Sequence, residues 1–435
     1  MHLTGRSVLV LLVGLVPVVL LGGSAQAAVV VLALWLLAWC VLVGIDLLVA
    51  GSPRAIVLER SVPDRVRLGE RAEAELLITN TGRRRITGVV RDAWEPSAGA
   101  LRTRTALRLP PGERRAVTTV LEPRRRGERR ALHVTVRSNG VLGLAGRQAT
   151  RSAPATVRVL PPFRSRRHLP SRLARLRELE GRTSVMIRGQ GTEFDSLREY
   201  VRGDDVRSLD WRATARRREP VVRTWRPERD RRVVVVLDTG RTSAARIADE
   251  PRLDTAIEAA LLLSALAAGA GDRIDVLAFD RTRRARVHGA TGSEVLGRVV
   301  DALAPVQPQL IETDWSAVPA QVRALVSQRS LVVLLTALDS VGASEGLLAV
   351  LPQLTRTHTV VVACAVDPEL VEMAADRSDR AAVYTAAAAE RSLSDADRLS
   401  AAVRRLGGDV VLGTPEKLPP ALADRYLALK AAGRL

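Results

Sequence analysis

The second half of the chain alternates short, continuous apolar runs with longer amphipathic ones, and this alternation constrains the fold more than any other feature. The first run, Val233 to Asp238, is rich in β-branched residues, which is typical of a strand buried on both faces. Further strands are predicted over Ile274 to Phe279, Leu331 to Thr336 and Thr359 to Val366. Because helical patterns separate these strands, residues 231–435 are predicted to form a doubly wound α/β domain.

Residues 53–162 show a different pattern, in which short segments alternate apolar and polar side chains. Turn-forming triplets separate these segments at Asn80-Thr81-Gly82, Pro110-Pro111-Gly112 and Ser138-Asn139-Gly140. Several short strands at this spacing predict an antiparallel β-sandwich. No residue pattern within it indicates catalysis.

Two apolar stretches lie within residues 1–52 and predict attachment to a membrane. Ser7 to Leu21 is short for a spanning helix, whereas Ala27 to Ala50 can cross a hydrocarbon core of about 30 Å. The close succession of the two stretches favours a transmembrane helical hairpin. The alternative for the first stretch is a signal peptide, since Ala25-Gln26-Ala27 resembles a cleavage site.

Basic residues follow the second stretch at Arg54, Arg60, Arg65 and Arg67, while the turn between the two stretches carries no charge. The positive-inside rule therefore predicts a protein of the cell (inner) membrane with the bulk of its chain in the cytoplasm. Asp46 lies near the cytoplasmic end of the second stretch, from which its carboxylate can reach the membrane interface.

The net charge of +19 comes almost entirely from arginine, since Lys417 and Lys430 are the only lysines. The arginines are spread over every segment, which makes a dedicated nucleic-acid surface the less favoured interpretation. A membrane-tethered nucleic-acid binder stays an alternative, resting on the runs Arg83-Arg84-Arg85, Arg124-Arg125-Arg126 and Arg216-Arg217-Arg218. With two cysteines, the chain cannot build a disulfide framework or a cysteine-based zinc site.

Residues 163–230 contain a run, Gly189 to Arg216, that combines acids, arginines and glycines with aromatic residues in a chain that is only 3% aromatic. Apolar residues at regular intervals predict that the run is ordered. It resembles the signature of the domain-of-unknown-function 58 family, whose chemistry is unassigned. The residues of this signature segment are Glu193, Phe194, Asp195, Arg198, Tyr200, Gly203, Asp204, Asp205, Arg207, Asp210 and Trp211.

The interleaved acids and arginines of the signature segment predict an internal network of ion pairs that serves structure or docking. The alternative is a metal-dependent enzyme, in which the clustered carboxylates bind a metal or transfer protons. No histidine or cysteine stands close to them in the sequence, and phosphate-loop, nucleophile-elbow and zinc-protease motifs are missing from the chain. We therefore assign no catalytic residue and no small-molecule substrate.

The loop after the first strand of the α/β region, Asp238 to Ser243, resembles the metal-ion-dependent adhesion site of von Willebrand factor type A domains. The resemblance implies a magnesium site whose ligands are Asp238, Thr242, Thr313 and Asp339. Gly240 supplies no oxygen where the family has a serine, so the site is degenerate and Mg²⁺ is expected to bind weakly or not at all. If the site is merely weakened, a serine at position 240 is expected to tighten binding; the alternative is that Asp238 and Thr242 only cap the loop and the following helix.

Together, these resemblances imply a membrane-anchored, cytoplasmic-facing protein-interaction module rather than an enzyme. The family resemblance implies a MoxR-type AAA+ ATPase as its partner, in the assembly or maturation of other protein complexes. A type A domain recognises partners at the carboxyl end of its sheet, where Asp238 and Thr242 are predicted to lie.

Overall fold

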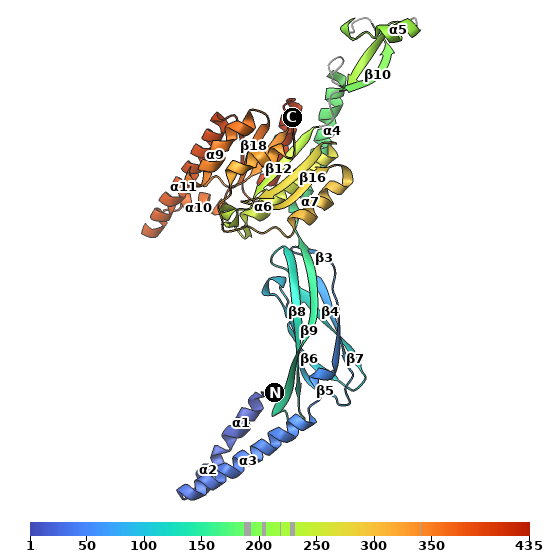
Figure 1. Cartoon of the computed structure of the whole chain (residues 1–435). Helices are drawn as coiled ribbons and strands as arrows, with labels where there is room; N and C mark the ends of the chain where they lie inside the picture. The colour runs from blue at the N-terminus through green and yellow to red at the C-terminus, as the bar shows by residue number, and fades with distance from the viewer. Residues whose placement is uncertain (187–192, 202–205, 218, 227–230, 340) are drawn as a thin grey trace. The chain divides into compact units, whose positions relative to one another are not determined.

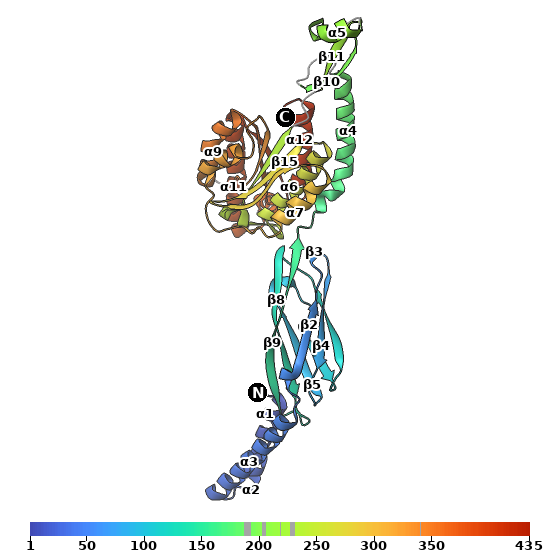
Figure 2. The same cartoon turned by 45° about the vertical axis from the view of Figure 1, so that its right-hand side comes forward.

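The computed structural model describes residues 1–186, 193–201, 206–217, 219–226, 231–339 and 341–435. The chain divides into two compact units, residues 1–160 and residues 161–435. Figures 1 and 2 show the helices and strands of each unit.

The first unit begins with three apolar helices, α1 (Gly5–Val13), α2 (Leu15–Leu21) and α3 (Ala25–Val49). Within the described residues, α3 is the one helix long and apolar enough to cross a membrane, with a mean hydropathy of 2.8. The stretch Gly5–Leu21 is shorter and is divided between two helices, and α3 runs back along α2 (Figure 1). The structure therefore replaces the predicted hairpin of two spanning helices with one candidate span, which length and composition allow to be an anchor or a signal sequence.

Two sheets form the rest of the first unit, and they confirm the predicted antiparallel β-structure. A six-stranded sheet has the order β1-β9-β8-β5-β6, with β3 paired to β9, and a three-stranded sheet has the order β2-β4-β7. The strands are β1 (His2–Leu3), β2 (Ile56–Ser61), β3 (Arg65–Arg67), β4 (Ala72–Asn80), β5 (Ile86–Trp94), β6 (Arg104–Leu109), β7 (Arg114–Leu121), β8 (Gly127–Asn139) and β9 (Ala145–Leu160). Alternate residues of β4 are buried, as expected of a strand with one face on a core.

A buried ion pair lies inside this β-structure. Arg60 on β2 contacts Asp92 on β5, and each side chain is only 3% exposed. Asp92 also accepts a hydrogen bond from Trp94 Nε1 at 2.9 Å, and the Arg60 guanidinium lies 5.3 Å from the centre of the Trp94 ring. Arg60, which the sequence places among the arginines that follow the apolar stretch, is therefore buried inside the sandwich.

The second unit contains a six-stranded sheet with the order β16-β15-β12-β17-β18-β19. Its strands are β12 (Arg232–Asp238), β15 (Arg273–Phe279), β16 (Arg283–Ala290), β17 (Leu331–Leu335), β18 (Thr359–Ala365) and β19 (Asp409–Gly413). All neighbours are parallel except the edge strand β16, which is antiparallel to β15. The predicted parallel α/β architecture is confirmed, because the apolar runs fill both faces of the central strands.

Helices cover both faces of this sheet (Figure 2). The helices of the second unit are α4 (Leu169–Met186), α5 (Trp211–Arg217), α6 (Arg252–Gly269), α7 (Val295–Leu303), α8 (Val318–Arg323), α9 (Val341–Thr355), α10 (Pro368–Ala375), α11 (Arg380–Arg405) and α12 (Leu418–Ala431). Buried side chains of α8, α9 and α11 pack with β12, β17 and β18 into one apolar core. Helix α11 begins at Arg380, directly after Asp379, which caps it by accepting a hydrogen bond from Ala382 N at 2.7 Å.

Residues 163–230 supply α4 and a small hairpin. Helix α4 packs on α6 and α12, and Arg172 pairs with Asp424 of α12 at 2.7 Å. The hairpin pairs β10 (Glu193–Glu199) with β11 (Val221–Arg226), and the short helix α5 lies between these strands in the sequence.

Candidate functional site

The candidate site lies where strand order reverses in the sheet. Strand β12 is central, the chain continues to β15 on one side, and it later returns to β17 on the other. Loops that leave such a switch point diverge and open a crevice at the carboxyl ends of the strands. Asp238 is the last residue of β12 and is 3% exposed, so its carboxylate forms the floor of this crevice.

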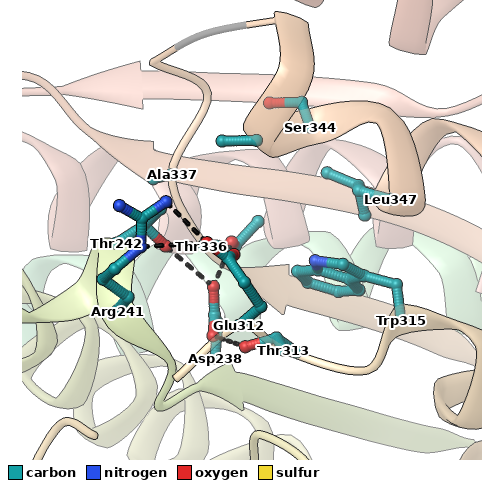
Figure 3. Close-up of a pocket in the computed structure, with 11 residues that line it drawn as sticks. Asp238, Arg241, Thr242, Glu312, Thr313, Trp315, Thr336, Ala337, Ser344 and Leu347 are labelled. Atoms are coloured by element: carbon teal, nitrogen blue, oxygen red, sulfur yellow. Dashed lines mark hydrogen bonds and ion pairs between the residues drawn. The ribbon is translucent and has the colours of Figure 1, made fainter. Parts of the chain in front are cut away.

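Three hydroxyls and one amide converge on the Asp238 carboxylate (Figure 3). Oδ1 accepts hydrogen bonds from Gly240 N at 2.8 Å and Thr313 Oγ1 at 2.5 Å. Oδ2 accepts from Thr336 Oγ1 at 2.7 Å and Thr242 Oγ1 at 3.3 Å. Each hydroxyl donates its hydrogen bond to Asp238, so the lone pairs on its oxygen remain available to a ligand.

Position 240 is close to the hydroxyl of Thr313. A Cβ built on Gly240 would lie 2.2 Å from Thr313 Oγ1 and 3.1 Å from Asp238 Oδ1. The Thr313 hydroxyl thus occupies the space that a serine side chain at 240 would need. A serine at position 240 can therefore add a ligand only if the Thr313 side chain moves, because a Cβ cannot lie 2.2 Å from its hydroxyl oxygen.

A small pocket opens above the carboxylate. Its enclosed part has a volume of about 10 Å³, which is room for one water-sized particle. The residues that line it include Asp238, Thr242, Thr313, Thr336, Trp315 and Ser344 (Figure 3). The exposed pair Arg241 and Glu312, with nitrogen and oxygen 2.5 Å apart, stands at its rim.

Asp339, predicted as the second acid of the site, is engaged elsewhere. Arg252 at the start of α6 binds it with two hydrogen bonds, from Nη1 to Oδ2 at 2.5 Å and from Nη2 to Oδ1 at 2.9 Å. The Arg252 side chain is 9% exposed, and its Nη1 also donates to Thr242 O at 3.0 Å. Asp339 is not among the residues that line the pocket, since the loop after β17 carries it to Arg252.

Sequence reasoning missed most of the residues that line the pocket, among them Thr336, Ser344 and Trp315. Thr336 directly follows β17, the strand beside β12, and a hydroxyl at the end of a neighbouring strand could have signalled it. Ser344 comes from the first turns of α9, is 2% exposed, and its Oγ has no hydrogen-bond partner within the described part of the chain. Trp315 lines one side of the pocket with its aromatic ring. No signal in the sequence pointed to Ser344 or Trp315.

The pocket offers oxygen ligands of the kind that Mg²⁺ prefers, but few charges. Asp238 is the one lining carboxylate without an arginine partner among the described residues, because Arg241 binds Glu312. The donor set of Asp238, Thr242, Thr313 and Thr336 therefore fits a hard cation in ligand type, with low affinity expected from its single charge.

The signature segment forms the hairpin rather than part of the pocket. Glu193, Phe194 and Asp195 lie on β10, as does Arg198, and Tyr200 follows that strand. Arg207 lies in a short 3-10 helix, Val206–Ser208, while Gly203, Asp204 and Asp205 lie outside the described residues. Trp211 begins α5 and is 69% exposed.

Asp210 organises the described part of this hairpin. Its Oδ1 accepts hydrogen bonds from Arg212 N and Ala213 N, both at 3.0 Å, and so caps α5. Its Oδ2 accepts from Arg223 Nε on β11 at 2.8 Å. The hydrogen bonds from the Ala213 amide and the Arg223 guanidinium lower the pKa of Asp210 below its ordinary value.

Replacing Asp210 by alanine is expected to loosen the hairpin locally. Alanine removes the cap of α5 and the link to Arg223, so amides of α5 should exchange with solvent faster, while those of β12 should be unaffected. Because the folded-state pKa of Asp210 is lowered, the wild-type hairpin should keep this protection as the pH falls to the ordinary carboxyl pKa and lose it only below that. Hydrogen exchange with mass spectrometry tests this, and equal α5 protection in Asp210→Ala would contradict it.

The chain is similar to known proteins over part of its length. Two uncharacterised proteins, from Mycobacterium tuberculosis and Mycobacterium bovis, are each 28% identical to the chain over 197 residues, or 45% of this chain. The match spans 61% of the length of these relatives, and their names state no function.

Similar solved structures include the CARDB domain of a Pyrococcus furiosus protein, with a TM-score of 0.19, 22% identity, and coverage of 24% of this chain and 86% of that one. A β-glucosidase from Listeria innocua has a TM-score of 0.17, 18% identity, and coverage of 24% of this chain and 16% of that one. Neither likeness bears on function. The family model described as "Protein of unknown function DUF58" matches residues 196–390, and this part of the chain therefore belongs to the DUF58 family.

Proposed function

We propose that the protein is a membrane-anchored, cytoplasmic-facing interaction module that binds a MoxR-type AAA+ ATPase and helps to assemble or mature other protein complexes. Its second unit would serve as a von Willebrand factor type A-like domain, and α3 as the anchor. The pocket above Asp238 carries the proposal, because it places a buried carboxylate and three hydroxyls at the switch point of the sheet.

The lining of this pocket favours binding over catalysis. Among the described residues that line it there is no histidine, cysteine or lysine to act as a nucleophile or base. Asp238 accepts hydrogen bonds from three loops, which suits it to hold those loops in place. The space suits a single ion or water, so a partner protein would contact mainly the rim formed by Arg241 and Glu312.

Charge reversal at the rim tests this proposal. Arg241 and Glu312 are 60% and 55% exposed, so Arg241→Glu should leave the fold intact and weaken binding of the purified ATPase by about tenfold. The matched control is Arg377→Glu, which breaks a similarly exposed ion pair with Glu390 elsewhere in the same unit. Surface plasmon resonance with the full chain in nanodiscs gives both affinities. Equal affinities of the two variants for the ATPase would show that the rim is not part of the interface. If the wild-type protein does not bind the ATPase, the proposed partner is wrong.

The proposed topology gives a second expected result. Arg54 and Arg65 follow α3, so the sandwich and the second unit should lie in the cytoplasm. A fluorescent protein that folds only in the cytoplasm should be active when fused after Leu435, and a phosphatase that folds only outside should be inactive there. An active phosphatase fusion would reverse the proposed orientation.

A further inference from the structure

The turn between β8 and β9 exposes apolar side chains at the end of the sandwich from which α3 leaves (Figure 1). Val141 is 84% exposed and Leu142 is 46% exposed. We call residues 140–144 the hairpin tip. Exposing two neighbouring apolar side chains to water costs free energy, and exposed apolar surface often marks a site of contact with a protein or a membrane.

The hairpin tip is fixed to the last turn of α3 by Asp46. This side chain is 1% exposed, and its Oδ1 accepts a hydrogen bond from Leu142 N at 2.8 Å. Its Oδ2 accepts from Leu144 N at 2.7 Å and from Ala145 N at 2.9 Å. A Cβ built on Gly140 would lie 2.0 Å from Asp46 Oδ1, so this close approach requires glycine.

Further contacts hold the tip at the same level of the helix. Arg147 Nε donates to Leu47 O at 3.0 Å, beside the Asp46 contact. Thr4 N donates to Leu144 O at 3.0 Å, and Thr4 Oγ1 donates to Gly143 O at 2.6 Å, so the segment before α1 binds the tip as well. The tip therefore cannot swing away from the end of α3 without breaking several buried hydrogen bonds.

The position of Asp46 sets the depth of the tip. It lies three residues before the end of α3 at Val49, a rise of about 5 Å, so in a spanning helix it lies at the boundary between acyl chains and headgroups. The apolar surface of α3 is itself exposed along its length, and the tip continues that surface. Arg147 and Arg6, which reaches Gly143, supply the positive charge that anionic headgroups attract.

We infer that Val141 and Leu142 insert into the lipid interface next to α3 and form a second membrane contact of the protein. This inference rests on the proposed membrane anchoring by α3. The contact would fix how the first unit stands on the bilayer, because a helix alone leaves the sandwich free to tilt about its end.

Spin labels on the full chain in nanodiscs of phosphatidylcholine and phosphatidylglycerol test the inference. Cys40 is replaced by alanine, whereas Cys364 can stay, since it is buried and burial raises the pKa of its thiol to about 11. Labels are placed by Val141→Cys, by Leu132→Cys and by Leu37→Cys. Leu132 is the matched control, because it is 62% exposed on the same β8–β9 pair but seven residues from Asn139, or roughly 20 Å along the strand.

We expect the label at position 141 to collide freely with oxygen and to be shielded from a water-soluble nickel chelate, as at position 37. The ratio of its collision rate with oxygen to that with nickel should be several-fold above the same ratio at position 132. Equal nickel access at positions 141 and 132 would overturn the inference while leaving the anchor in place. Shielding of position 141 from both reagents would also overturn it, because the tip would then be covered by protein. Nickel access at position 37 would instead show that the proposed anchoring by α3 fails.

Discussion

Replacing Asp92 by alanine is expected to destabilise the first unit by about 3–5 kcal/mol, since it leaves the Arg60 guanidinium buried without its counter-ion. Burial already lowers the pKa of Arg60, and Asp92 opposes that shift. Without the carboxylate, the charged form of Arg60 loses its main stabilisation inside the sandwich. Hydrogen exchange of β5 and β8 amides in the full chain should accelerate by about a hundredfold or more.

The neighbouring residue on the same strand provides the control. Glu59 pairs with Arg114, but the two side chains are 60% and 48% exposed, so Glu59→Ala should cost at most about 1 kcal/mol. The double variant Arg60→Leu with Asp92→Leu should be more stable than Asp92→Ala, because no buried charge is left without a partner. If the amides of β5 and β8 exchange at the same rate in Asp92→Ala and Glu59→Ala, the buried ion pair does not stabilise the sandwich.

Replacing Gly240 by serine is expected to destabilise the second unit by about 1–3 kcal/mol, the usual cost of inserting atoms into filled space. The backbone of Gly240, with φ of −75°, is open to any residue, so the cost comes from crowding of the added Cβ. The closest atom is Thr313 Oγ1 at 2.2 Å, followed by Ile311 O at 3.0 Å and Asp238 Oδ1 at 3.1 Å. The displaced Thr313 hydroxyl would also lose its hydrogen bond to Asp238. Exchange of β12 amides in the full chain measures the effect.

A second substitution separates this contact from other causes. Thr313→Ala in the Gly240→Ser background should recover most of the loss, since the serine hydroxyl can then take the vacated space beside Asp238. Gly297→Ser on α7 is the matched control and should be close to neutral, because a Cβ there meets no atom within 4 Å. Equal stability of Gly240→Ser and Gly297→Ser would mean that Thr313 does not fill the space at 240.

Much of the architecture could be predicted because it depends on local patterns. The β-branched run that forms β12 can be satisfied only by burial on both faces, and helices are the elements that cover such strands. The place of Asp238 follows from the same pattern, since it ends a central parallel strand. Turn triplets likewise located the ends of β4 and β8.

The partners of charged residues could not be predicted in this way. Asp339 follows β17 at a plausible distance for the site, but Arg252, 87 positions away in the sequence, binds it. Asp210 pairs with an arginine of its own segment, as an internal network requires, but the sequence did not indicate that this partner is Arg223, which is 46% exposed, or that Asp210 caps α5. The partners of Asp46 gave no signal in the sequence either, since its carboxylate accepts backbone amides of the hairpin tip 96 and 98 positions away.

The sequence alone therefore determined the order and type of the layers, the apolar helix α3, and the strand end at which Asp238 stands, because periodicity and burial act along the chain. Tertiary structure alone decided that Thr313 takes the space at Gly240, that Thr336 replaces Asp339 beside Asp238, and that Arg60 lies inside the sandwich. The physical reason is range. Hydrogen bonds and steric contacts act over a few ångströms between segments remote in sequence, and only the folded chain brings those segments together.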